Sequence, residues 1–304
     1  MKRILLATVG VGLIAVIAAT LAFAKTTSTT GPTRAEATLP PLPAEVKARN
    51  RFIVGVKCDV PPFGYIDVQG HNQGFDVEIG RWFARYAFGR AQRVTFVCAP
   101  TAAREPLITS GRVDLVISTF TYTADRATRI DFSEPYYNAT GRLLVKNSGA
   151  VQKLADIKGH NVATTSGSVY DRWMKNCFPT TEVITADTFT NAKLAFDQGR
   201  ADAVMFDDGA LLPVAAADPN SKIADDVFLA SAPYGIGMRK GYTEMKAWVD
   251  SRLEVMRKKD QFLPILKANV PPRFFTSFSK NILRPNQTFQ YAAPGSPSVD
   301  TVCQ

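Results

Sequence analysis

Residues 52–117 read FIVGVKCDVPPFGYIDVQGHNQGFDVEIGRWFARYAFGRAQRVTFVCAPTAAREPLITSGRVDLVI. Short β-branched runs alternate in this stretch with segments whose apolar residues follow a helical spacing. The predicted elements are strands at 52–56, 94–97 and 113–117, with helices from Phe75 and at 104–109. This β-α-β-α-β order predicts a parallel sheet with helices on its faces, and therefore an α/β fold.

The same alternation starts again in the second half of the chain. It predicts strands at 161–164, 182–184 and 203–206, with helices at 168–175 and 191–197. A long amphipathic helix is predicted at 243–258, where the apolar residues at helical spacing are Met245, Trp248, Val249, Leu253 and Met256. Two α/β units in tandem are expected to bind a ligand where the carboxyl ends of strands face a crevice.

The two ends of the chain differ from this middle part. Residues 1–24 combine a basic start with 21 uncharged residues and a closing Ala-Phe-Ala, which predicts export by a cleaved signal peptide or by an uncleaved membrane anchor. Residues 25–49 are rich in Thr, Pro and Ala, and we expect a flexible linker because they can bury little apolar surface. Residues 285–304 resemble this linker and are predicted to be a C-terminal tail.

Charge and cysteine content exclude several classes of protein. The net charge of +9 comes from scattered cations, which favours a basic surface over a nucleic-acid site. With two histidines and no CxxC pair, neither a metal site nor another cofactor is expected. An even number of cysteines is compatible with two disulfides in an oxidising compartment, and the four candidates are Cys58, Cys98, Cys177 and Cys303.

Six segments carry a family resemblance. They are Gly55-Val56-Lys57-x-Asp59-x-Pro61-Pro62-Phe63, Gly74-Phe75-Asp76-Val77-Glu78-Ile79, Gly111-Arg112-Val113-Asp114, Thr119-Phe120-Thr121-x-Thr123-x-x-Arg126, Asp131-Phe132-Ser133-Glu134-Pro135-Tyr136-Tyr137 and Gly199-Arg200-Ala201-Asp202-Ala203. In this order and spacing the sequence resembles the bacterial extracellular solute-binding proteins of family 3, the polar amino-acid binders of ABC importers. Within that family it looks most like the aspartate/glutamate-binding branch.

The resemblance implies a type II periplasmic-binding-protein fold, often called a Venus flytrap. Lobe 1 would consist of residues 50–140 and 235–284, and lobe 2 of residues 141–234. Two strands would cross between the lobes, near 141–146 and 233–238. Such a protein is periplasmic or extracytoplasmic, is expected to be a monomer without catalytic activity, and delivers its amino acid to a membrane permease with an ATPase.

The resemblance also implies how the zwitterion is bound. Arg126, Thr121 and Ser168 match positions that bind the α-carboxylate, for which a guanidinium fork and a helix N-terminus are suited. Asp207 and the carbonyl of Thr119 match the positions that bind the ammonium. The alternatives are a surface ion pair for Arg126, a plain helix N-cap for Ser168 and a turn residue for Asp207.

Side-chain specificity rests on two further cations. Lys57 and Arg104 match positions that face the second carboxylate of the ligand in the aspartate/glutamate-binding branch, although solvated surface cations are the alternative. Phe189 stands where that branch can carry a tyrosine, so glutamine is not excluded as ligand. Phe63 is the predicted apolar wall of the site, and ordinary core packing is an equal expectation for it.

The family's sheet order also suggests the disulfides. Cys58 and Cys98 end neighbouring strands in it, which implies a bridge between them, and a second bridge from Cys177 to Cys303 would tie the tail to lobe 2. Buried or free thiols are the alternative.

Two other functions are compatible with this fold. One is a periplasmic dehydratase of the cyclohexadienyl type, which would need an acid or base over the substrate ring. The other is a sensor module, which would use the N-terminal segment as an anchor. The first fits poorly with a carboxylate-ammonium clamp, so a binding protein is the prediction.

Overall fold

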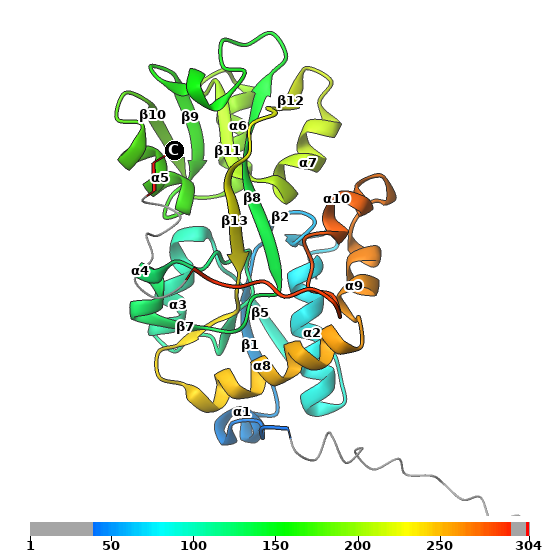
Figure 1. Cartoon of the computed structure of the whole chain (residues 1–304). Helices are drawn as coiled ribbons and strands as arrows, with labels where there is room; N and C mark the ends of the chain where they lie inside the picture. The colour runs from blue at the N-terminus through cyan, green and yellow to red at the C-terminus, as the bar shows by residue number, and fades with distance from the viewer. Residues whose placement is uncertain (1–38, 293–301, 304) are drawn as a thin grey trace, which may run out of the picture. The chain divides into compact units, whose positions relative to one another are not determined.

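The computed structural model describes residues 39–292 and 302–303, and two mixed sheets divide this part of the chain into two lobes (Figure 1). The predicted signal peptide or anchor at 1–24 lies outside the described residues. Within the described part, no helix has the length and apolar character needed to cross a membrane.

The sheet of lobe 1 has the strand order β5-β1-β6-β14-β7. Strand β1 runs parallel to β5 and β6, as the sequence predicts, whereas β14, which follows β13 much later in the chain, is antiparallel to β6 and β7. The bounds are Phe52–Val56 (β1), Val94–Cys98 (β5), Leu115–Val116 (β6), Ile130–Phe132 (β7) and Gly237–Arg239 (β14).

Helices cover both faces of this sheet. On one face lie α2 (Phe75–Phe88) and α8 (Thr243–Lys258), and Trp248 of α8 packs against Phe52 of β1 with ring centroids 5.3 Å apart. The other face holds α3 (Arg104–Thr109) over a separate apolar cluster. Neighbouring residues Leu115 and Val116 belong to the two different clusters, because side chains alternate along a strand.

The sheet of lobe 2 repeats this plan with the strand order β10-β9-β11-β8-β12. Strand β9 is parallel to β10 and β11, and β8 is antiparallel to β11. The bounds are Tyr137–Lys146 (β8), Asn161–Thr165 (β9), Glu182–Ala186 (β10), Ala203–Asp207 (β11) and Ser221–Ile223 (β12), with helices α5 (Val169–Cys177), α6 (Phe189–Asp197) and α7 (Asp208–Ala217).

Two antiparallel strands cross between the lobes. They are β8 and β13 (Phe228–Tyr234), which pair directly and run side by side through the middle of Figure 1. Both begin earlier than the predicted crossovers near 141–146 and 233–238. At the lobe 1 end of the pair Tyr137 lies opposite Tyr234, and their rings stack with centroids 5.2 Å apart.

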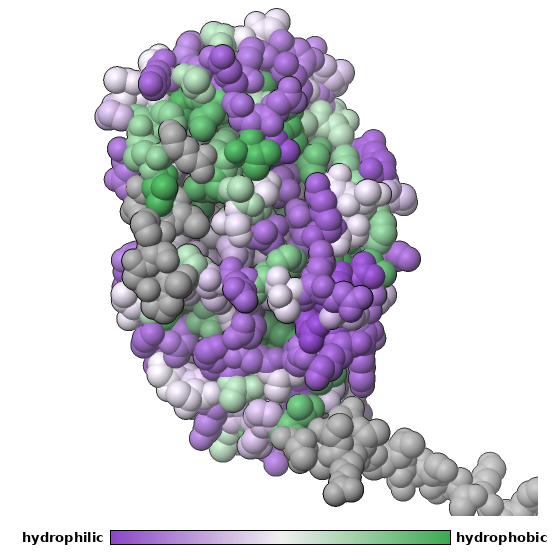
Figure 2. Space-filling model, viewed as in Figure 1, coloured by the Kyte–Doolittle hydropathy of each residue, from purple (hydrophilic) through white to green (hydrophobic). Residues whose placement is uncertain are grey.

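Smaller elements complete lobe 1. A three-stranded antiparallel sheet follows β1, and short helices surround the C-terminal part. These elements are β2 (Asp59–Val60), β3 (Gly64–Ile66), β4 (Asn72–Gln73), α4 (Ala124–Arg129), α9 (Phe262–Asn269) and α10 (Phe275–Ser279), with 3₁₀ turns at Thr101–Ala103 and Pro272–Phe274 and, in lobe 2, at Leu154–Ile157. The face of lobe 1 seen in Figure 2 is mainly hydrophilic, as expected of the exposed side of an amphipathic covering helix such as α8.

The linker prediction for 25–49 is wrong at its C-terminal end. Residues Ala44–Arg49 form helix α1, whose Val46 is fully buried. The Tyr242 hydroxyl donates to Glu45, and Arg49 pairs with Asp114. One apolar side chain and two polar contacts are enough to dock this turn, although its composition is that of a linker.

The tail contacts both lobes. The ring of Tyr291 stacks on Tyr122 of lobe 1 with centroids 4.1 Å apart, and its hydroxyl donates to the Ser133 carbonyl at 2.7 Å. On lobe 2 the Trp173 indole donates to the Val302 carbonyl at 2.7 Å. Both predicted disulfides are confirmed: they join Cys58 to Cys98 and Cys177 to Cys303.

Candidate functional site

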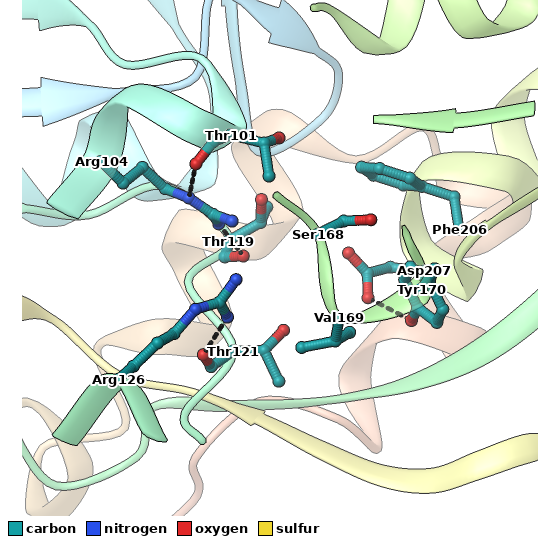
Figure 3. Close-up of a pocket in the computed structure, with 10 residues that line it drawn as sticks. All are labelled: Thr101, Arg104, Thr119, Thr121, Arg126, Ser168, Val169, Tyr170, Phe206 and Asp207. Carbon is teal, nitrogen blue, oxygen red and sulfur yellow. Dashed lines mark hydrogen bonds between the residues drawn. The ribbon is translucent and has the colours of Figure 1, made fainter. Parts of the chain in front are cut away.

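A narrow pocket lies between the two lobes (Figure 3). The structure brings six of the eight predicted ligand-binding residues to its wall. The lobes touch beside it, since an Arg126 nitrogen of lobe 1 donates to the Gly167 carbonyl of lobe 2 at 2.9 Å. The lining residues are Thr101, Arg104, Thr119, Thr121, Arg126, Ser168, Val169, Tyr170, Phe206 and Asp207.

Arg126 is held in place by its own loop. The Thr123 hydroxyl caps α4 by accepting from the Arg126 backbone N–H at 3.1 Å, and the Arg126 guanidinium donates to the Thr121 carbonyl at 2.7 Å. Its Nε lies 3.4 Å from a carboxylate oxygen of Glu105. The side chain is only 1% exposed, so Arg126 is a buried cation at the pocket and not a surface ion pair.

The N-terminus of α5 faces Arg126 from lobe 2. Ser168 is its N-cap, and its hydroxyl accepts from the Asp171 N–H at 3.0 Å. Ser168 therefore caps the helix and lines the pocket at the same time. Gly167 before it has a φ of 73°, and an added Cβ would lie 3.3 Å from the Cα of Ala102 in lobe 1. The positive helix end and the guanidinium together favour an anionic group.

Asp207 is the acidic group of the pocket. It ends β11, is 4% exposed, and accepts a hydrogen bond from the Tyr170 hydroxyl at 2.6 Å (Figure 3). Burial raises the pKa of this carboxyl to about 6, although the hydrogen bond from Tyr170 works in the opposite direction. Asp207 is thus a pocket carboxyl in the described structure, and not a plain turn residue.

Thr119 has a left-handed backbone conformation, and a hydrogen bond to Asp76 of α2 holds it in place. Its φ of 43° is positive, and its N–H donates to a carboxyl oxygen of Asp76 at 2.8 Å. The other oxygen of Asp76 accepts from the Tyr136 hydroxyl at 3.0 Å. Burial raises the pKa of Asp76 to about 7. The Thr119 carbonyl, predicted to receive the ligand ammonium, accepts here from Arg104 at 2.9 Å.

Lys57 and Arg104 are buried cations. They are 1% and 3% exposed, which contradicts the alternative of solvated surface side chains. The Lys57 ammonium donates to the Thr101 hydroxyl at 2.6 Å and lies behind the lining residues. Arg104 lines the pocket and donates to the carbonyls of Thr101 and Ser118. Burial, followed by the nearby charge of Arg104, lowers the pKa of Lys57 to about 7.

The two phenylalanines singled out by the sequence take other places. Phe63, predicted as the apolar wall, is fully buried in the core, with its ring edge-on to Tyr137 at 5.0 Å. The wall that lines the pocket is formed instead by Phe206, against which Phe189 packs at 4.8 Å. The backbone N–H of Phe189 donates across the lobes to Asp59 at 2.6 Å.

Four lining residues were missed by sequence reasoning. Tyr170 and Val169 lie in the first turn of α5 next to Ser168, and Phe206 directly precedes Asp207, so their neighbours in the sequence were the available signal. Thr101 comes just before Arg104. In the parts of the chain that the structure describes, no cluster of His, Cys, Asp or Glu could hold a metal ion.

The chain is similar to several amino-acid-binding proteins. A glutamine-binding protein of Geobacillus stearothermophilus is 32% identical over 64% of this chain and 75% of its own length. An L-glutamate/L-aspartate-binding protein of Pseudomonas aeruginosa is 29% identical over 69% of this chain and 73% of its own. The crystal structure of a solute receptor for L-cysteine of Neisseria gonorrhoeae has a TM-score of 0.75 and 28% identity over 77% of this chain and 95% of that one.

The sequence profile of one family spans both lobes. It matches residues 52–269, which include every lining residue of the pocket. The two mixed sheets joined by β8 and β13 give the type II periplasmic-binding-protein fold. The chain belongs to the bacterial extracellular solute-binding proteins, family 3.

Proposed function

We propose that this chain is the substrate-binding protein of an amino-acid ABC importer and that it prefers an acidic amino acid. The observation that carries the proposal is the pair of opposite charges at one pocket: Arg126 with the α5 N-terminus on one side and Asp207 on the other. Such a pair complements an α-carboxylate and an α-ammonium.

The preference for an acidic side chain rests on the balance of charge. Lobe 1 contributes Lys57, Arg104 and Arg126 near the pocket, with Glu105 beside Arg126, whereas lobe 2 contributes Asp207, so the cations remain in excess. A second carboxylate on the ligand would offset part of this excess, whereas a cationic side chain would add to it. The relative from Pseudomonas aeruginosa is named for glutamate and aspartate. Glutamine, for which other relatives are named, is the alternative ligand.

The remaining parts of the proposal follow from membership of the family. We place the protein outside the cytoplasmic membrane as a monomer that passes its amino acid to a permease with an ATPase. Several similar proteins are named for an ABC transporter, among them an ABC transporter glutamine-binding protein of Bacillus subtilis. We expect prephenate and arogenate to be left unchanged.

The clamp is tested by removing either charge. We expect Arg126→Ala and Asp207→Ala each to weaken amino-acid binding roughly 30-fold or more, because truncating one partner leaves the other charge buried. Isothermal calorimetry against the amino acid that most raises the melting temperature measures this loss. Unchanged affinity in either folded variant would contradict the site.

The side-chain preference needs a different pair of variants. Lys57→Met and Arg104→Met keep most of the buried volume and remove one positive charge each. We expect both to weaken glutamate and aspartate more than glutamine. Equal losses for all three ligands would remove the basis for an acidic preference while leaving the clamp intact.

A further inference from the structure

The ring of Phe120 lies against both arginines of the pocket. The guanidinium carbon of Arg104 is 4.4 Å from the ring centroid, and that of Arg126 is 5.1 Å from it. Both distances are within the range of a cation–π interaction. Phe120 itself is 1% exposed and lies behind the lining residues.

Two buried guanidiniums beside one ring bring two positive charges close together. Lys57 is a third buried cation nearby, and its pKa is lowered in part by the charge of Arg104. Like charges repel strongly where little water screens them. Arg104 donates to main-chain carbonyls, and Arg126 also lies near Glu105. The negative face of an aromatic ring is a further group that stabilises both cations without adding a charge that would repel an anionic ligand.

The ring cannot move away from this position. The Phe120 carbonyl accepts from the Gly235 N–H at 3.0 Å, which ties the loop to the segment after β13. The ring packs edge-on against Phe132 at 5.0 Å. It also fills the space above Gly237, where an added Cβ would lie 2.9 Å from a ring carbon. The hydrogen bond to Gly235 and the close approach to Gly237 hold the ring even where the contact with Phe132 is loosened, and the ring in turn fixes the arginines.

We propose that Phe120 is a positioning residue that holds the guanidiniums of Arg104 and Arg126 together at one wall of the pocket, ready for the two carboxylates of an acidic amino acid. This inference rests on the proposed function. It assigns to Phe120 a role in specificity that differs from core packing, because a residue that only packs would affect stability and not ligand choice.

The test compares two phenylalanines of the same apolar cluster. Phe120→Leu removes the ring beside the arginines. Phe132→Leu is the matched control, because this buried ring packs against Phe120, Tyr122 and Tyr291. We expect Phe120→Leu to weaken glutamate and aspartate binding about 3- to 30-fold, with a smaller loss for glutamine, and Phe132→Leu to change affinity less than about twofold. Phe120→Tyr keeps an aromatic face and is expected to retain most of the affinity.

A second readout does not depend on any ligand. Because both guanidiniums lie close to the Phe120 ring, we expect its ring current to shift the Nε–H proton signals of Arg104 and Arg126 in the NMR spectrum of the unliganded protein. We expect these shifts to disappear in Phe120→Leu and to persist in Phe132→Leu. Equal affinity losses in the two leucine variants, or unaltered arginine signals in Phe120→Leu, would overturn the positioning role. Failure of the wild-type protein to bind any amino acid would instead overturn the proposed function.

Discussion

Asp207 is buried, and its proposed role, binding the ligand ammonium, requires that its carboxyl be negatively charged. Because burial raises its pKa to about 6, protonation competes with binding of the ligand ammonium below that pH. We expect affinity to fall by up to about tenfold per unit as pH drops from 6 to 5, and to be constant between 7 and 8. Calorimetry with glutamine measures this effect, since its neutral side chain is least sensitive to the charge of Lys57.

The control for this pH dependence is Asp207→Asn. This variant should bind weakly and with little change across the same pH range. A wild-type affinity that stays constant down to pH 5 would show that Asp207 does not receive the ammonium.

Asp76 gives a prediction about stability. Its pKa is raised to about 7 in the folded protein by burial, despite hydrogen bonds from Thr119 and Tyr136. A carboxyl whose folded pKa exceeds its unfolded value releases its proton more readily on unfolding, so it lowers the free energy of unfolding as pH rises from about 4 to 7. In Asp76→Asn the side chain at this position does not titrate, so this pH dependence of the free energy of unfolding is absent.

Urea unfolding at pH 4.5 and at pH 8 measures the effect of Asp76. Relative to wild type, Asp76→Asn should gain stability with rising pH, by at most about 1.4 kcal/mol per unit of pKa shift. Other titrating groups are present in both proteins and cancel in the difference. A difference that is the same at both pH values would contradict the raised pKa.

Single charged residues were the most predictable part of the site. Arg126 and Asp207 were predicted because they stand at positions that match the motifs of the family that the sequence resembles. Aromatic residues were not predictable in the same way. Phe63 follows two prolines and Phe206 ends a short apolar run, and only the three-dimensional packing places one ring in the core and the other at the pocket.

At the scale of elements, α5 and α6 form a matched pair. Each has nine residues and a hydroxyl N-cap: Ser168 accepts from Asp171, and Thr188 accepts from Asn191 at 3.2 Å. Ser168 lines the pocket, whereas Thr188 is not among the lining residues. Both Ser168→Ala and Thr188→Ala should cost about 1 kcal/mol of stability, and only Ser168→Ala should also weaken ligand binding several-fold.

Thermal unfolding and calorimetry on the two variants separate capping from ligand contact. If both alanine variants keep wild-type affinity, Ser168 is a helix cap only. If both lose affinity equally, the loss comes from a general loosening of lobe 2.

Elements were predictable where the local sequence pattern specifies them, whatever their distance in the chain from the elements they pack against. The strand at 52–56 and the helices at 104–109 and 243–258 have the predicted bounds, since local periodicity specifies them. The predicted crossover strands begin too late in the sequence. Strands β8 and β13 pair with each other although they are far apart in the chain, and a local sequence pattern does not predict such a pairing. Helix α1 was not predicted because it depends on burial of Val46 against the rest of the protein, which the linker-like composition does not indicate.

At the scale of the whole molecule, two disulfides close loops of different length. The separation is 126 residues for Cys177–Cys303 and 40 residues for Cys58–Cys98. In the chain-entropy account a longer loop restricts the unfolded state more. Replacing Cys177 and Cys303 by serine should lower the free energy of unfolding by about 2–5 kcal/mol, and by about 1 kcal/mol more than replacing the other pair.

Guanidinium unfolding of the two double variants without reductant measures this difference. A larger loss for the Cys58 and Cys98 pair would mean that its position beside the pocket outweighs the length of its loop. No loss for the Cys177 and Cys303 pair would contradict a stabilising role of the attached tail.

The bridge at Cys303 also changes what a cut in the backbone does. Residues 177–303 form a covalent ring that includes β13 and the C-terminal part of lobe 1. A protease that cleaves this ring once, for example at Val227 with 48% of its surface exposed, leaves a single covalent molecule, which denaturing electrophoresis resolves into two fragments only after a thiol is added. A cut at the exposed Ser148, between the two bridges, separates the fragments without any thiol.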